Sequence, residues 1–237
     1  MNCKNIVFIL LSIILFTSFT EKKEGLHLFI LSGQSNMELL KPEESFLPIL
    51  KSKFGKNNII VAKYALGTQP IRKWYRDWKP IKGDEPKAAP YLYDSLMKKV
   101  YPAIKNKKIA TISFIWMQGE RDAKTSRGEV YEQSLLGLYK QLCSDLKRDD
   151  VNFILGRLSD FGMANNTHPH WTMIRYIQVK LAELNPRFGW INTDDLNDGF
   201  DRKGKAIQND IHMSAEGYVV MGERFANKAI QLIEDNN

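Results

Sequence analysis

The sequence has few of the residues that build disulfide scaffolds: only two of its 237 residues are cysteines. Two cysteines cannot form the disulfide framework on which small secreted domains depend. One of them, Cys3, precedes an apolar run near the N-terminus. The other, Cys143, lies in a helical pattern, where a lone cysteine is expected to pack as a small hydrophobic side chain. The fold must therefore be stabilised by its core.

The sequence also lacks a concentrated basic segment, although its formal net charge is +7. The basic residues are scattered, with only short pairs such as Lys107-Lys108, and no nucleic-acid-binding motif is present. There is no internal repeat, low-complexity tract or linker. Hydrophobic residues make up 43% and charged residues 26% of the chain, as in ordinary globular proteins. We therefore expect one globular domain over residues 25–237 and no nucleic-acid partner.

No apolar run reaches the roughly 20 residues that a membrane-spanning helix needs. The longest covers residues 6–16, follows Lys4 and is followed by a charged stretch at residues 21–24. This pattern predicts a secretory signal peptide over residues 1–20. An N-terminal anchor is the alternative, because no small-x-small cleavage site precedes Glu21. The mature chain would carry a net charge of about +6 and no stable membrane span, and we expect it in the periplasm or outside the cell.

Strand-like and helix-like segments alternate along the rest of the chain. Apolar runs typical of buried parallel strands cover residues 26–31, 59–65, 109–116, 151–155 and 188–191. Helical spacing of apolar residues occurs over residues 91–104, 135–146, 171–184 and 218–232, with Ser214 as the expected N-cap of the last helix. This alternation predicts an α/β fold with a parallel sheet of about five strands.

Ligands of such sheets bind beyond the carboxyl ends of the strands, so the residues after each strand are the most informative. Gly33-Gln34-Ser35-Asn36 follows the first strand. A serine on a tight strand-to-helix turn can expose its hydroxyl group and direct its N–H toward a substrate. The alternative for Ser35 is a helix N-cap without a chemical role.

One histidine stands out among the four. His27 lies inside the first predicted strand, and His168 and His170 flank a proline at a helix start, where they suit structural or capping roles. His212 lies in a loop before the last helix and has an acid close by, Asp210. A histidine next to an acid has the components of a general base and its orienting group.

Donors for a developing negative charge occur after other strands. The Gln118 amide follows the third strand, and the Gly67 N–H follows the second. With the Ser35 N–H they make three candidate donors. Each residue alone has an ordinary structural explanation, but together they supply a nucleophile, a base and an oxyanion site.

The motifs that carry these residues resemble the SGNH hydrolases, and specifically their sialate O-acetylesterase-like branch, which includes carbohydrate esterase family six. The matching segments are residues 31–37, 65–74, 116–122 and 210–212, and the resemblance covers residues 26–234. It implies a three-layer α/β/α flavodoxin-like fold and hydrolysis of O-acetyl esters on an acetylated carbohydrate, without a metal or another cofactor. It implies Ser35 as nucleophile, His212 as base, and an oxyanion hole formed by Ser35, Gly67 and Gln118.

The sequence departs from the family pattern at the acid that orients the histidine. The family spacing is Asp-x-x-His, but Asn209 occupies that position and Asp210 lies only two residues before His212. Residues two apart share a face in an extended segment, so Asp210 can still orient His212. Asn209, Glu120 or a backbone carbonyl are the alternatives. Arg121 also departs from the family, which usually has serine there.

Several neighbours of these motifs are candidates for substrate binding or support. Trp74 can stack on a sugar face and Arg72 can pair with a sugar carboxylate, although an ordinary packed loop is an equal alternative. The full set of such candidates is Gln34, Asn36, Arg72, Trp74, Glu120 and Asn209. Two other functions stay open: a catalytically impaired carbohydrate-binding homologue, and a short-chain lipid esterase or thioesterase.

Overall fold

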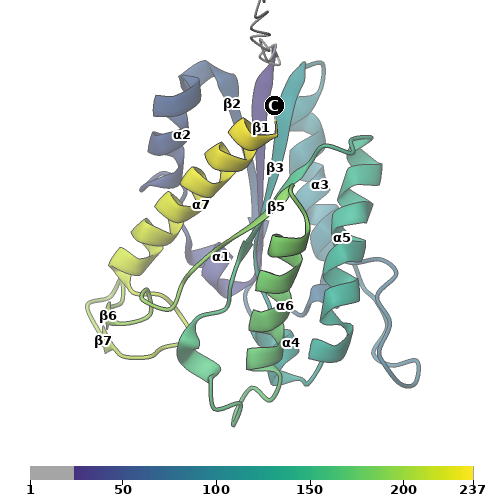
Figure 1. Ribbon diagram of the computed structural model, residues 1–237, viewed down its shortest axis with the longest axis vertical. Helices are drawn as coiled ribbons and strands as arrows, with labels where there is room; N and C mark the ends of the chain where they lie inside the picture. The colour runs from purple at the N-terminus through teal and green to yellow at the C-terminus, as the bar shows by residue number, and fades with distance from the viewer. Residues whose placement is uncertain (1–23, 237) are drawn as a thin grey trace, which may run out of the picture.

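A computed structural model describes residues 24–236 of the chain, so the predicted signal peptide at residues 1–20 lies outside the described residues. A five-stranded parallel sheet in the order β2-β1-β3-β4-β5 forms the centre of the molecule (Figure 1). The strands are β1 (Leu26–Gly33), β2 (Ile59–Ala65), β3 (Ile109–Met117), β4 (Asn152–Gly156) and β5 (Phe188–Ile191). The predicted parallel sheet of about five strands is thus confirmed.

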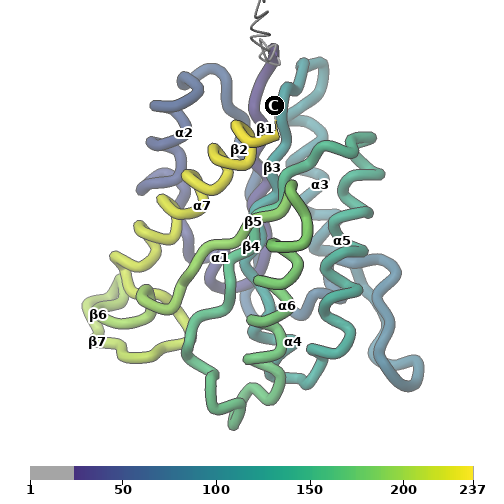
Figure 2. The backbone as a smooth tube through the Cα atoms, in the orientation of Figure 1, coloured from purple at the N-terminus to yellow at the C-terminus, as the bar shows by residue number. Residues whose placement is uncertain are grey.

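Helices cover both faces of this sheet, which gives three layers (Figures 1 and 2). The helices on one face are α2 (Phe46–Phe54) and α7 (Ala215–Asp235), and those on the other are α3 (Tyr91–Ile104), α5 (Tyr131–Leu146) and α6 (Trp171–Leu184). The short helices α1 (Ser35–Leu39) and α4 (Glu120–Lys124) follow β1 and β3, and β6 (Gly199–Phe200) and β7 (Ala206–Ile207) form a small hairpin before α7. No helix within residues 24–236 is long and apolar enough to cross a membrane.

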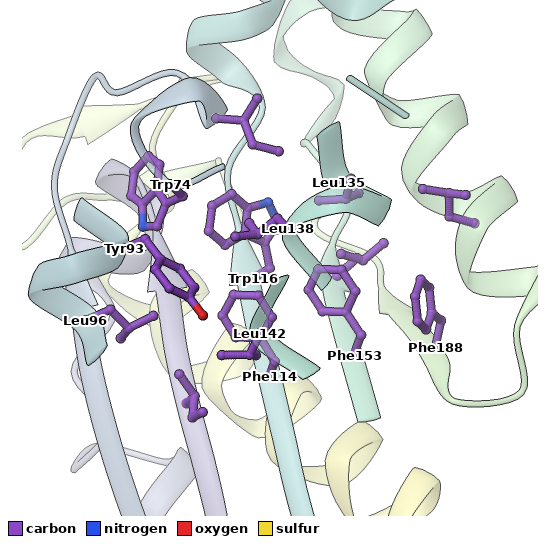
Figure 3. Packing of buried hydrophobic residues seen from close by; sticks show 14 of the residues in the cluster. Trp74, Tyr93, Leu96, Phe114, Trp116, Leu135, Leu138, Leu142, Phe153 and Phe188 are labelled. Atoms are coloured by element: carbon purple, nitrogen blue, oxygen red, sulfur yellow. The ribbon is translucent and has the colours of Figure 1, made fainter. Parts of the chain in front are cut away.

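Alternating side chains of the strands build two separate cores. On β1, Leu28 and Ile30 face the α3 and α5 side, whereas Phe29 and Leu31 face α2 and α7. The first core is rich in aromatic rings, and Figure 3 shows Trp116 and Phe114 together with Leu138 and Leu142, which come from helix α5. Burial on both faces explains why the strands appear in the sequence as continuous apolar runs.

The predicted strands agree with the observed ones to within two residues at each end, and the predicted helices at residues 91–104 and 171–184 agree at both ends. Ser214 caps α7 as expected, because its Oγ accepts a hydrogen bond from the Gly217 N–H at 3.0 Å. The missed elements are α1, α2, α4 and the β6–β7 hairpin. Each has nine residues or fewer, which is too short for a clear periodic pattern.

Glycine at position 33 brings the ends of β1 and β3 together. Its φ of +146° disfavours other residues, and a Cβ there would lie 1.9 Å from the Met117 carbonyl oxygen. The next residue, Gln34, donates its N–H to that same oxygen at 2.9 Å. This close approach brings the residues after β1 next to those after β3, with Gln34 beside Gln118 at the carboxyl edge of the sheet.

Candidate active site

The structure brings Ser35 and His212, the predicted nucleophile and base, into direct contact. Ser35 is the first residue of α1, and His212 lies in the loop that leads into α7. The His212 Nε2 and Ser35 Oγ atoms are 3.1 Å apart, which is hydrogen-bonding distance. The loop is fixed by Ser214, whose N–H donates to the Leu196 carbonyl at 2.8 Å. This geometry suits transfer of the serine proton to the histidine.

Asp210 is the carboxylate beside the other nitrogen of His212. Its Oδ1 lies 3.7 Å from His212 Nδ1, beyond hydrogen-bonding distance, and accepts the His212 backbone N–H at 2.8 Å. Asn209 faces elsewhere, because its N–H donates to Asp198 at 2.6 Å and its Oδ1 lies 3.4 Å from Asn197 Nδ2. Asp210 is therefore better placed than Asn209 to orient the imidazole, after a small movement of its carboxylate.

Asn36 connects Glu120 to the histidine loop. Its Nδ2 donates to Glu120 Oε1 at 2.9 Å and to the Ile211 carbonyl at 3.0 Å, while its Oδ1 accepts from the Tyr218 hydroxyl at 2.9 Å. Glu120 thus reaches the segment next to His212 through Asn36. Burial raises the pKa of Glu120 to about 7, and its Oε2 has no hydrogen-bond partner in the described structure.

The Gln118 amide is completely buried and turned toward the protein. Its Nε2 lies 2.6 Å from Asp122 Oδ2 and 3.1 Å from the Gln69 carbonyl oxygen, so both N–H groups already have acceptors. An oxyanion would have to displace one of them. Burial raises the pKa of Asp122 to about 6. Gln34 Oε1 lies 3.4 Å from the same Nε2 and accepts the Arg121 N–H at 3.1 Å, which ties Gln34 into this network.

The Gly67 N–H also has an acceptor in this structure. It donates to Glu38 Oε2 at 2.8 Å, and a Cβ on Gly67 would lie 3.5 Å from Ser35 Cβ. The Gly67 N–H therefore lies against Ser35, as expected, but it already donates to the Glu38 carboxylate. Glu38 is exposed and its side chain can rotate away. The Ser35 N–H is in the first turn of α1, where a helix offers it no acceptor.

The expectation that Trp74 stacks on a sugar is wrong. Its ring is fully buried, packs edge-to-face against Trp116 and donates its Nε1–H to Ser32 Oγ at 3.0 Å (Figure 3). No face is free for a ligand, and the packed-loop alternative applies. Arg72, by contrast, is half-buried and lines a surface cavity.

Three residues of this network were not singled out from the sequence: Glu38, Asp122 and Tyr218. Asp122 had the clearest signal, since it follows Gln118 by four residues and so can lie on the same side of a helix start. Tyr218 fits the apolar helical pattern of α7, and that pattern gives no sign that its hydroxyl bonds Asn36. Among residues 24–236, no group of three or more His, Cys, Asp or Glu side chains could hold a metal ion.

The comparisons with known proteins give one matching family and several structures of the same fold. The sequence model of a family described as "Carbohydrate esterase, sialic acid-specific acetylesterase" matches residues 39–231, a span that begins just after Ser35. No curated protein matches the chain. A solved protein of Arabidopsis thaliana is 18% identical and has a TM-score of 0.64, over 88% of this chain and 99% of that one.

Two further solved structures have the same fold. A carbohydrate acetylesterase from Xanthomonas citri is 15% identical, with a TM-score of 0.65 over 87% of this chain and 56% of its own. NanS is 13% identical, with a TM-score of 0.63 over 90% of this chain and 99% of its own. At these identities the likeness concerns the fold, and the family is shown by the sequence match.

Proposed function

Because the chain belongs to the carbohydrate esterase family of sialic acid-specific acetylesterases, we propose that it removes O-acetyl groups from carbohydrates with Ser35 as nucleophile. The observation that carries this mechanism is the 3.1 Å contact between Ser35 Oγ and His212 Nε2. Both groups are partly exposed to solvent, so an ester can reach them.

The first half of the reaction acylates the serine. His212 Nε2 takes the Ser35 proton as Oγ forms a bond to the acetyl carbon. The negative charge on the carbonyl oxygen is held by the Ser35 N–H and by the Gly67 N–H once Glu38 has moved. Removal of one such donor from a serine protease raises the barrier by about 3 kcal/mol. The sugar oxygen then leaves with the proton from His212.

The second half releases acetate. A water molecule gives a proton to His212 and attacks the acetyl carbon of the acyl-serine, and the ester bond to Ser35 breaks as the proton returns to Oγ. Asp210 stabilises the imidazolium that forms in both halves.

Replacement of the nucleophile tests this mechanism. We expect Ser35→Ala to abolish hydrolysis of p-nitrophenyl acetate while the unfolding temperature stays within a few degrees of the wild type. Ser95→Ala is the matched control, because Ser95 lies half-buried on α3, as Ser35 does on α1, and its hydroxyl donates to the Tyr91 carbonyl at 2.8 Å. Undiminished turnover by Ser35→Ala would overturn the assignment.

The substrate is a carbohydrate in this proposal, and sialic acids and polysaccharides are the two candidate groups. Acetate release from O-acetylated sialic acid, acetylated xylan and acetylated pectin, measured side by side, distinguishes them. A series of nitrophenyl esters of increasing chain length tests the lipid esterase alternative: a carbohydrate deacetylase should lose activity sharply beyond acetate.

A catalytically impaired carbohydrate-binding protein is the second candidate. Two observations favour it: Glu38 occupies the Gly67 N–H, and Asp210 lies 3.7 Å from His212. A fluorophosphonate probe separates the two, since it labels Ser35 only where the serine is activated. We further propose that the chain is exported, and mass determination of the N-terminus of the mature protein tests removal of residues 1–20.

A further inference from the structure

A basic cavity lies next to the proposed acyl site. It has a volume of about 340 Å³, and its walls are residues 68–73, Pro86 and the segment around helix α4. Four of its lining side chains are basic, namely Arg72, Lys73, Arg121 and Arg127, and all four are half-buried. No aspartate or glutamate lines it. The cavity thus presents positive charge with no acidic side chain on its walls.

The arginines of the cavity differ from most others in the protein. All ten arginines of the sequence lie in the described residues 24–236, and six of them form salt bridges with carboxylates there. The remaining four are Arg72, Arg121, Arg127 and Arg187, and only Arg187 lies outside the cavity. Three of the four arginines without a salt bridge in the described residues therefore line one cavity.

Neutral partners hold two of these guanidinium groups in place. Arg72 Nη1 donates to the Lys87 carbonyl at 3.0 Å, and the Arg127 guanidinium lies 5.3 Å from the centre of the Trp78 ring. Neither contact compensates the charge. Burial together with the Arg72 charge lowers the pKa of Lys73. The buried acid Asp122 accepts hydrogen bonds from Gln118 and the Ile71 N–H and does not line the cavity. Burial raises its pKa, and the charges of Arg127 and Arg72 oppose this rise, so the carboxylate offsets part of the positive charge from behind the cavity wall.

The backbone links the cavity to the reacting groups. Thr68 and Gln69 directly follow Gly67, and two Cα–Cα steps span about 8 Å at most. On the other wall, the Arg121 N–H donates to Gln34, the residue before Ser35. The cavity is therefore joined to the serine on both walls, through residues 67–69 on one and through Gln34 on the other.

We propose that this cavity binds the carboxylate of an acidic sugar, and that Arg72, Arg121 and Arg127 select such sugars among acetylated carbohydrates. Guanidinium groups form paired, charge-assisted hydrogen bonds with a planar carboxylate, which lysine cannot match. The inference rests on the proposed esterase function, because it names the class of sugar presented to Ser35.

Matched substrates test the selection. The first pair is an O-acetylated methyl glucuronoside and the methyl glucoside acetylated at the same position. The second pair is O-acetylated sialic acid and its carboxamide, and the two pairs show which acidic sugar is used. At low ionic strength we expect kcat/KM to favour the acid at least tenfold, and Arg127→Gln and Arg72→Gln each to lower this ratio about tenfold. The preference should shrink as salt is added.

Arg187→Gln is the control, since it removes an unpaired arginine at the start of β5, remote from the cavity, and should leave the ratio unchanged. A wild-type ratio near one in both pairs, or an equal loss in Arg187→Gln, would overturn the inference.

A binding measurement keeps the inference separate from the esterase function. Calorimetric titration of Ser35→Ala with methyl glucuronoside, methyl glucoside, sialic acid and its carboxamide needs no turnover. We expect at least one acid to bind and its neutral partner to bind at least tenfold more weakly, with the difference lost in Arg127→Gln. If the wild type hydrolyses no acetyl ester yet this difference is present, the esterase proposal fails and the carboxylate site stands. If neither acid binds better than its neutral partner, the carboxylate site is refuted.

Discussion

Glu120 should make the stability of the protein fall as the pH rises through neutrality. Glu120 is only 2% exposed, and burial raises its pKa from an ordinary value of 4.5 to about 7. Below pH 4.5 both the folded and the unfolded states hold the proton. Between these two pKa values the folded state binds more protons than the unfolded state, so the free energy of unfolding decreases with pH.

The size of this effect follows from the two pKa values. A difference of one pKa unit corresponds to 1.36 kcal/mol, so the shift of Glu120 amounts to about 3 kcal/mol of unfolding free energy. Glu120→Gln removes the titration but keeps an oxygen that can accept from Asn36. Any constant cost of the new amide group is the same at every pH and cancels when two pH values are compared.

Urea unfolding at pH 5 and pH 8.5 measures the prediction. We expect the wild type to lose about 2 to 3 kcal/mol more than Glu120→Gln between these pH values, because pH 5 lies above the ordinary pKa of 4.5 and so misses part of the full effect. Asp122, whose pKa is also raised, is present in both proteins and contributes to both losses in the same direction. Equal losses in the two proteins would refute the reasoning, because they would show that Glu120 carries its charge in the folded state at pH 5.

Three further substitutions probe the network around Ser35. Asp210→Asn removes the charge beside His212 but keeps an acceptor for its N–H, and should lower kcat on p-nitrophenyl acetate at least tenfold; a smaller loss than in Glu120→Gln would show that Asp210 is not the main orienting group. Asn36→Ala leaves the Tyr218 hydroxyl and Glu120 without their partner, and should lower the urea-derived unfolding free energy by about 3 kcal/mol; a loss below about 1 kcal/mol would contradict this. Glu38→Ala frees the Gly67 N–H and should raise kcat several-fold; a decrease would mean that Glu38 assists the reaction.

The strands and long helices could be predicted because each buries a continuous apolar run or stripe. Residues 59–65 and 91–104 are assigned correctly to their ends on this basis alone. The pairing of Ser35 with His212 was also predictable, because both follow the carboxyl edge of a parallel sheet. The two residues are 177 positions apart in the sequence, but the parallel topology places both at the same edge of the sheet.

The orientation of polar side chains could not be predicted in the same way. Gln118 was expected to face the substrate, but Asp122 lies one helical turn later and draws its amide inward. Trp74 is an aromatic residue of the kind that stacks on sugars, yet its ring is buried in the core against Trp116 of β3 and donates to Ser32 of β1. The direction of a polar side chain depends on which hydrogen-bond partner lies nearest in space. The periodicity of the sequence does not contain this information.

Both ends of the described chain lie at the edge of the sheet opposite Ser35. The Leu26 N–H bonds the Lys108 carbonyl just before β3, and Asn236 Nδ2 bonds the Pro186 carbonyl just before β5 (Figure 1). Strand β1 has eight residues and so extends about 26 Å from this edge to the serine. The protein can therefore be immobilised on a bead or fused to another domain through either end while the serine faces the surrounding solution, and a bulky glycan can approach it without meeting the support.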